Sequence, residues 1–376
     1  MKRILYFMPD NPMSGKAGNI TRLQQMLSYF NDNDVFEADF VSLRDWGMWK
    51  ENDEEEFKKR YKNVKLFLLE KKYKKNFFKY LFLYKIPYLF KSNPIDISSY
   101  ILKKEFRKIA KSGGYDKIVV SYASWGSMIK DSEIKSYKII DTHDFITAQN
   151  RERQDKIGTF FKGEMDILRY FDEIWTYSIE EEYIFSQFTN RKVTLMPISF
   201  PSHDNSNNGT YPYEIIYVAS DNPHNILGIN WFINEVLPHL GNHKVHVIGK
   251  IGNVLPEHPN IIKHGLVDSL DDYYKSAKIA ICPMLSGTGI KIKVLEALSY
   301  SLPVVTNRRG IDGLINKSLN GCLVSESGLE FADNIMKLLN DNKFYEEIKH
   351  YGKKYFLENH MINQEKKILD HTFLND

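Results

Sequence analysis

The amino-acid sequence predicts an α/β protein of two Rossmann-like, doubly wound domains, and three observations support this prediction. Short apolar runs typical of buried strands alternate with longer amphipathic stretches along the whole chain. Residues 199–212 are rich in Ser, Asn, Pro, Gly and His, which is the composition of a linker. The chain has 376 residues, which exceeds the usual size of one domain, so two domains are expected.

The composition is that of an ordinary globular protein, with 43% hydrophobic and 26% charged residues. The net charge of +3 is small and argues against a general nucleic-acid binder. Cys282 and Cys322 form neither a CxxC motif nor a Cys/His cluster, which favours a reduced, cytoplasmic setting. We expect neither a signal peptide nor a membrane span, because no apolar run approaches the ~20 residues that cross a bilayer.

In the first half, apolar runs predict strands at residues 4–8, 115–122, 138–141, 173–178 and 193–198. A glycine-containing loop with Gly15 and Gly18 follows the first of these runs, and a helix follows the loop. A strand, a glycine loop and a helix place backbone N–H groups where a phosphate or sugar docks. Simple turn formation by these two glycines is an equally open interpretation.

His143 is the main candidate for chemistry in the first half. It directly follows the predicted strand 138–141 and is flanked by Asp141 and Asp144. Ligands of open α/β sheets bind outside the carboxyl ends of the strands, so this position suits a functional histidine. A hydrogen-bonded turn histidine stays open as the alternative.

Residues 51–92 differ in composition from the rest of the chain. An acidic cluster at residues 53–56 is followed, within residues 58–91, by lysines interleaved with Phe, Tyr and Leu. A basic, aromatic-rich helical pair of this kind can lie on an anionic membrane surface. Ordinary helices with a buried aromatic face and solvated lysines fit the same pattern, and nucleic acid is a poorer partner.

The second half repeats the α/β pattern. Strands are expected at residues 214–219, 244–249, 261–265 and 279–285, and helices at residues 225–240 and 268–276. After the stretch 286–306, a further strand is expected at residues 320–324. From residue 329 onwards the chain is predicted helical, with one apolar face formed by Phe331, Ile335, Leu338 and Leu339.

The stretch 286–306 predicts an anion-binding turn. A Gly-Thr-Gly turn opens a helix on which Ile290, Val294 and Leu298 repeat at helical spacing, and a buried strand follows. Glycines at a helix start let backbone N–H groups approach a phosphate, and the helix dipole favours negative charge there.

Two lysines lie in the first turn of this predicted helix. Lys291 and Lys293 oppose the helix dipole by a few tenths of a kcal/mol to ~1 kcal/mol each, a penalty that a bound diphosphate would reverse. The alternative is a solvated helix end on which Glu296 merely pairs with Lys293.

Taken together, these motifs resemble glycosyltransferases of the GT-B type, in which two Rossmann-like domains face a central cleft. The detailed resemblance is to the large retaining family 4, of the glycosyl transferases group 1 type, and it covers nearly the whole chain. In that family a glycine-rich loop like residues 15–18 meets donor and acceptor, and a histidine like His143 contacts the donor sugar. A glutamate like Glu296, in Lys-Val-Leu-Glu-Ala-Leu, binds the ribose of the nucleotide.

The sequence departs from the family pattern at two places. Thr288 stands where the family usually has an acidic residue that contacts the donor sugar. Residues 220–223, Ser-Asp-Asn-Pro, lack the Arg and Lys that many members use to hold the diphosphate. A subgroup with Gly-Thr-Gly-Ile-Lys in this turn is similar, and there Lys291, with Lys293 in support, would supply the missing cation.

The resemblance implies a set of site residues. We assign catalysis to His143, Lys291 and Glu296. Donor binding is assigned to Gly287, Thr288, Gly289, Ile290, Lys293, Gly249, Gly15 and Gly18, and acceptor binding to Lys16, Asn19 and Arg151. We expect no metal site, because no DxD-type acidic pair occurs in the right context, and no cofactor, because the UDP- or GDP-sugar is a substrate.

The implied function is retaining transfer of a hexosyl or related sugar from a nucleotide-diphosphate donor to a glycan or lipid-linked glycan, in cell-surface polysaccharide synthesis. A catalytically silent GT-B module that binds carbohydrate or supports a partner transferase is the alternative. We expect a cytoplasmic protein, and attachment to the inner face of the membrane depends on residues 58–91.

The expected domains are an acceptor domain (1–198), a linker (199–212) and a nucleotide-sugar domain (213–355). Residues 356–376 are expected to form a C-terminal helix that packs back toward the N-terminal domain.

Overall fold

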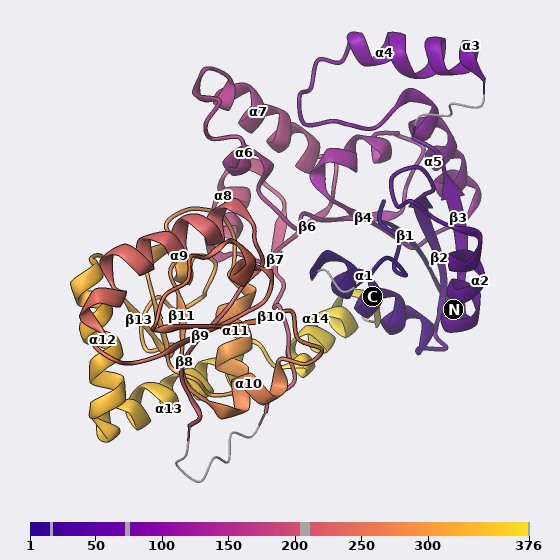
Figure 1. The fold of residues 1–376 in the computed structure, drawn as a ribbon. Helices are drawn as coiled ribbons and strands as arrows, with labels where there is room; N and C mark the ends of the chain where they lie inside the picture. Colours follow the sequence, from indigo (N-terminus) through magenta and orange to yellow (C-terminus); the bar gives the residue numbers. More distant parts are fainter. Residues whose placement is uncertain (16–17, 72–75, 204–210, 375–376) are drawn as a thin grey trace. The chain divides into compact units, whose positions relative to one another are not determined.

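A computed structural model of the chain describes residues 1–15, 18–71, 76–203 and 211–374. The chain forms two compact units. Unit 1 comprises Met1–Thr176 and Glu181–Leu195, and unit 2 comprises Tyr177–Glu180 and Met196–Asp376. Each unit is built on a parallel sheet with helices around it (Figure 1). Half of the predicted linker, residues 204–210, lies outside the described residues.

The sheet of unit 1 has seven parallel strands in the order β3-β2-β1-β4-β5-β6-β7. The strand order reverses between β1 and β4, which is the topological switch point of a doubly wound sheet. The strands are β1 (Lys2–Phe7), β2 (Phe36–Leu43), β3 (Val64–Leu69), β4 (Lys117–Ser121), β5 (Tyr137–Asp141), β6 (Glu173–Thr176) and β7 (Lys192–Leu195).

Helices surround this sheet and bury a large apolar core against it. Phe7 of β1 packs edge-on against Phe106, with ring centroids 5.7 Å apart, and also contacts Trp125. The helices of this half are α1 (Gly18–Asn31), α2 (Glu51–Arg60), α3 (Phe77–Tyr80), η1 (Leu81–Lys85), α4 (Ile86–Leu89), α5 (Tyr100–Ser112), η2 (Ala123–Ile129), α6 (Ile146–Gln149), η3 (Gln154–Lys156), α7 (Ile157–Leu168) and α8 (Ile179–Thr189).

Two strands of unit 1 differ from the sequence-based expectation. The predicted strands did not include β2, and β3 lies inside the block 58–91 that was predicted as a helical pair, so that prediction is wrong for Val64–Leu69. β3 pairs with β2 at the edge of the sheet, and of its residues Val64 alone is fully buried. A half-exposed edge strand with a lysine among apolar residues looks like an amphipathic helix when only the sequence is considered.

The sheet of unit 2 has six parallel strands in the order β10-β9-β8-β11-β12-β13, and its switch point lies between β8 and β11. The second-half strands were predicted to within a few residues. The strands are β8 (Tyr213–Val218), β9 (Val245–Ile248), β10 (Ile261–Gly265), β11 (Ala277–Cys282), β12 (Val304–Thr306) and β13 (Cys322–Val324).

Both faces of this sheet are covered. Ile215 and Phe331 belong to one apolar cluster, whereas Ile216 and Leu298 belong to the other, as alternation along a strand requires. The helices are α9 (Pro223–Glu235), η4 (Leu237–His239), η5 (Lys250–Val254), α10 (Asp271–Ser276), α11 (Ile292–Ser299), η6 (Arg308–Ile311), α12 (Gly328–Asn340), α13 (Asn342–Asn359) and α14 (Ile362–Leu374). No helix among the described residues is long and apolar enough to cross a membrane.

His360, between α13 and α14, fastens the chain that enters unit 2. Its Nδ1 lies 3.0 Å from the carbonyl oxygen of Ile198, and its Nε2 lies 3.1 Å from the hydroxyl of Tyr355. The backbone N–H of Phe200 donates to the carbonyl of His360 at 3.0 Å. Burial lowers the pKa of His360 to about 4, so the ring is neutral at physiological pH.

Because the unfolded chain has an ordinary histidine pKa of about 6.5, only the unfolded state binds this proton between pH 6.5 and about 4. We expect the His360 contribution to lower the free energy of unfolding by ~2 kcal/mol between pH 7.5 and pH 5. Urea unfolding of wild type and His360→Gln at both pH values measures this, and the variant should depend less on pH. His239→Gln, at an exposed position, is the control. Equal pH dependence of wild type and His360→Gln would contradict the prediction.

Candidate functional site

The switch point of unit 2 brings two loops together, one after β8 and one after β11. These strands are neighbours in the sheet, so their carboxyl ends and the loops that follow them are adjacent. His224 Nδ1, in the first turn of α9, lies 2.8 Å from Ser286 Oγ in the loop after β11. The Asn222 side chain caps α9 by accepting a hydrogen bond from the backbone N–H of Asn225 at 2.9 Å. Two helix starts therefore lie at this edge of the sheet.

The Gly-Thr-Gly turn after β11 needs its glycines. Gly287 and Gly289 have φ angles of 91° and 71°, in the left-handed region that residues with a β-carbon rarely adopt. The helix that follows, α11, begins at Ile292, two residues later than the sequence predicts, so Ile290 precedes the helix. Lys291 occupies the N-cap position of α11.

The Lys291 side chain folds back on this turn. Its ammonium donates to the carbonyl oxygens of Gly289 at 2.6 Å and Thr288 at 3.3 Å. Only 7% of the residue is exposed, and burial lowers the pKa of Lys291. The lysine therefore holds the turn in shape from within.

Lys293 lies in the first turn of α11 and joins it to the first turn of α9. Its ammonium donates to Asn225 Oδ1 at 2.7 Å and lies 4.9 Å from the centroid of the Tyr217 ring. Burial lowers the pKa of Lys293, because an ammonium withdrawn from water is less stable. Among the described residues, the hydrogen-bond acceptor of the Lys293 ammonium is Asn225. The ion pair with Glu296 that the sequence offered as an alternative is not formed in this part of the chain.

Glu296 follows one turn later on α11. Its Oε2 accepts a hydrogen bond from the Tyr274 hydroxyl at 3.3 Å, and burial raises the pKa of its carboxyl group. Tyr274 stacks on Tyr300 with centroids 5.0 Å apart, and the Tyr300 hydroxyl donates to Asp271. Glu296 is thus a largely buried carboxylate oriented by an aromatic pair.

Gly249, predicted to bind the donor, is a glycine for a packing reason. Its φ is 104°, and a β-carbon there would lie 2.2 Å from the carbonyl oxygen of Ala219. The backbone after β9 therefore packs directly on the backbone after β8, at the same edge of the sheet.

In unit 1, a second polar cluster lies at the ends of β1, β4 and β5. Asp10 Oδ2 accepts hydrogen bonds from the Tyr122 hydroxyl at 3.2 Å and from Asn19 Nδ2 at 3.3 Å. The Tyr122 ring stacks on the His143 ring, with centroids 4.4 Å apart and an interplanar angle of 29°. Asn19 and His143, two predicted site residues, are thus brought into one cluster, and Asp10 and Tyr122 join it.

The backbone of this cluster is strained. His143 and Tyr122 have φ angles of 59° and 66°, which for residues with side chains cost of order 1 kcal/mol each. The buried Asp141 lies beneath, with Oδ2 3.6 Å from His143 Nε2 and 3.7 Å from Arg22 Nε. The one sequence signal for Arg22 is its charge on the otherwise apolar face of α1.

Glu164 on α7 supports the segment after His143. The carboxylate is fully buried and accepts from the backbone N–H groups of Ile146 and Thr147, at 2.9 and 2.8 Å, and from the Thr147 hydroxyl at 2.6 Å. These bonds cap the short helix α6. No local sequence motif marks Glu164 as a capping residue for α6.

The other predicted residues are more scattered. Gly15 has a φ of 134°, and Gly18 is the first residue of α1. Lys16 lies outside the described residues, and Arg151 is exposed on the turn after α6. Among the residues that the structure describes, no three His, Cys, Asp or Glu side chains are grouped as ligands of a metal ion.

Comparison with known structures identifies the fold. Sucrose-phosphate synthase from Thermosynechococcus elongatus aligns over 100% of both chains with a TM-score of 0.68 at 12% identity. HepE of Anabaena, solved with UDP and glucose, aligns over 100% of both chains with a TM-score of 0.65 at 10% identity. TarM aligns over 100% of this chain and 99% of its own with a TM-score of 0.67 at 14% identity. The chain has the GT-B fold.

Sequence comparison is more local. Residues 212–341 match the family described as glycosyl transferases group 1. This region contains the switch point of unit 2, both glycines of the turn, Lys293 and Glu296. No curated protein matches the sequence.

We expect Gly249→Ala to lower the free energy of unfolding by roughly 3 kcal/mol or more, because the added methyl group meets a backbone oxygen and the φ angle is positive. Gly241→Ala is the matched control: its φ is 58°, and a β-carbon there meets nothing within 4 Å, so a loss of about 1 kcal/mol is expected. Urea unfolding measures both. Equal losses in the two variants would show that the contact with Ala219 does not matter.

Proposed function

We propose that the protein is a glycosyltransferase that moves a hexosyl or related sugar from a UDP- or GDP-sugar donor to a glycan or lipid-linked glycan acceptor. The reaction proceeds with retention at the anomeric carbon. We place this reaction in the cytoplasm, without a metal ion, in the synthesis of cell-surface polysaccharide. The main support is the pair Lys293 and Glu296, both drawn away from water on one helix, within the region that matches glycosyl transferases group 1.

The donor would bind at the switch point of unit 2. The Glu296 carboxylate is suited to accept hydrogen bonds from the ribose hydroxyls, since Tyr274 already fixes its orientation. The N–H groups at the start of α11, with the Lys291 and Lys293 ammonium groups, are suited to the diphosphate. HepE has been solved in complex with UDP and glucose and in complex with UDP-glucose, which supports a nucleotide-sugar donor of this kind.

In the proposed reaction the acceptor hydroxyl attacks the anomeric carbon on the face from which the diphosphate leaves. The bond from the anomeric carbon to the phosphate oxygen breaks, the bond to the acceptor oxygen forms, and the acceptor proton passes to the leaving diphosphate. The lysines and helix N–H groups stabilise the negative charge that develops there, and one such donor is typically worth ~100-fold or more in rate. No carboxylate nucleophile takes part.

We assign the sugar and acceptor side to the cluster at the switch point of unit 1. His143 offers a ring nitrogen on a rigid, strained backbone, and Asn19 offers an amide at the start of α1. Gly15, Lys16, Gly18 and Arg151 belong to the same proposed assignment.

Thr288 favours a second candidate function, because the family usually has an acidic residue at this position. A catalytically silent GT-B module would bind carbohydrate or support a partner transferase without turnover. A panel of UDP- and GDP-sugars, read by calorimetry and mass spectrometry, separates the two. No nucleotide binding near millimolar concentration would exclude the enzyme.

We expect Glu296→Ala to raise the Kd of the nucleotide-sugar roughly ten- to a hundred-fold, because a hydrogen bond to a charged group is worth ~1.5–3 kcal/mol. Tyr274→Phe should have a smaller effect, since Tyr274 acts through Glu296. Calorimetry measures both, with Glu358→Ala, at an exposed position of α13, as the control. Unchanged binding in Glu296→Ala would remove this residue from the site.

We expect His143→Asn to lower kcat ~100-fold or more while changing the donor Kd little. Asn is the matched replacement because it tolerates the left-handed backbone at this position, so the fold is preserved. Initial rates and calorimetry on the same preparation separate turnover from binding. A variant with wild-type kcat would show that His143 is only a structural turn residue.

A further inference from the structure

An exposed helix stands apart from the sheet of unit 1. It runs from α3 through η1 to α4 and ends at Phe90, and we call residues 77–90 the outer helix. Figure 1 shows this helix standing off the sheet of unit 1. No residue of η1 or α4 is buried. The helix therefore leaves much of its apolar surface accessible to solvent.

The outer helix has two different faces. Tyr80, Tyr84 and Tyr88 form a stacked row, with successive ring centroids 5.3 and 5.9 Å apart. Tyr80 and Tyr84 are half-buried, whereas Tyr88 is 48% exposed. On the other face, Phe78, Phe82 and Leu89 are 70%, 59% and 74% exposed. Lys85 shares that face, since positions 78, 82, 85 and 89 recur at helical spacing.

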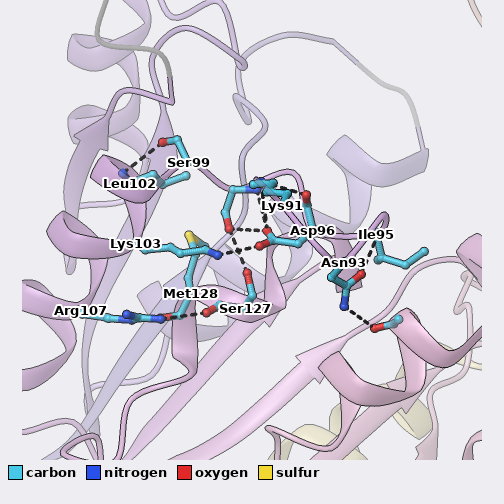
Figure 2. Close-up of polar contacts among 12 residues, drawn as sticks. Lys91, Asn93, Ile95, Asp96, Ser99, Leu102, Lys103, Arg107, Ser127 and Met128 are labelled. Atoms are coloured by element: carbon cyan, nitrogen blue, oxygen red, sulfur yellow. Dashed lines mark hydrogen bonds and ion pairs between the residues drawn. The ribbon is translucent and has the colours of Figure 1, made fainter. Parts of the chain in front are cut away.

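A network of charged groups around the buried Asp96 fastens the C-terminal end of the outer helix (Figure 2). Lys91 Nζ donates to the carbonyl oxygen of Asp96 at 2.9 Å and lies 5.0 Å from the centroid of the Tyr88 ring. The Asp96 carboxylate accepts from Lys103 of α5 at 2.6 Å. These contacts fix the direction of the helix, so its exposed face has a defined orientation on unit 1.

The charge of this segment is of one sign. Residues 71–91 contain seven lysines, eight aromatic residues and no Asp or Glu. Contact between two copies of this face would bring like charges together, and an apolar protein partner would leave the lysines unpaired. An anionic lipid surface satisfies both features, since the acyl region takes the aromatic rings and the phosphates take the ammonium groups.

We propose that the outer helix binds an anionic lipid bilayer, lying in the plane of the interface. Phe78, Phe82 and Leu89 enter the boundary between headgroups and acyl chains, and Lys85 contacts lipid phosphates. This inference rests on unit 1 alone and does not depend on the proposed transfer reaction.

Flotation with vesicles of mixed phosphatidylglycerol and phosphatidylcholine tests the apolar contribution, using the full chain. Wild type should float with these vesicles and not with phosphatidylcholine alone. The triple variant Phe78→Ser, Phe82→Ser, Leu89→Ser should bind at least ten-fold more weakly, with unchanged thermal unfolding. The matched control replaces Tyr183, Leu266 and Leu329, which are 68%, 71% and 57% exposed elsewhere, with Ser and should bind as wild type.

The basic contribution is tested separately. Replacing Lys85 with Gln should weaken binding about five-fold, whereas Gln at Lys354, which is exposed in unit 2, should not. Full vesicle binding by the triple Ser variant would overturn the proposal. Analytical sedimentation without lipid tests whether a second copy of the chain binds this face. A wild-type dimer that the Ser substitutions convert to a monomer would assign the face to a second copy and overturn the membrane assignment.

Discussion

The parallel direction of all strands is the constraint on which the candidate sites depend. In a parallel sheet every strand ends at the same edge, and each connection must return across one face to begin the next strand. Where the strand order reverses, two such connections leave in opposite directions and expose the edge between them. In unit 2 this happens between β8 and β11, and in unit 1 between β1 and β4. Helix starts, with their unpaired N–H groups, collect at these places as a result.

Both switch points contain polar groups withdrawn from water. In unit 2, Lys291, Lys293 and Glu296 are all partly or largely buried, and the pKa of each is moved toward the neutral form. Burying charge in this way destabilises the folded protein unless a partner of opposite charge arrives. A diphosphate beside the two lysines would restore favourable electrostatics, which is why this arrangement suits an anionic ligand better than an empty surface.

Much of the fold followed from the sequence because the strands of unit 2 are short apolar runs bounded by turn residues. The buried face of α12, with Phe331, Ile335 and Leu338, was also confirmed. The strand β3 was not predicted, because an edge strand is only half buried and its residues do not form a continuous apolar run. The start of α11 was placed too early because the helical repeat of Ile290 continues into the turn.

The sites were less predictable, since they depend on contacts between distant residues. His143 and Asn19 were singled out by their places beside a strand or a glycine loop. Tyr122, Asp10 and Glu164 act through partners on other elements, and nothing in their local sequence marks them. For the outer helix the sequence fits both a membrane-surface helix and an ordinary helix with a buried aromatic face. The choice depends on which side chains pack against the rest of unit 1, and the local sequence does not determine this.

The left-handed backbone at His143 has an evolutionary consequence. Asn, Asp and Gly occupy such a position with little loss of folding free energy, while β-branched residues are strongly disfavoured. The substitutions that preserve the fold at this position are therefore mainly to small residues, which lack an imidazole. One nucleotide change converts a histidine codon into one for Asn or Asp, so the imidazole can be lost in a single step while the fold is preserved.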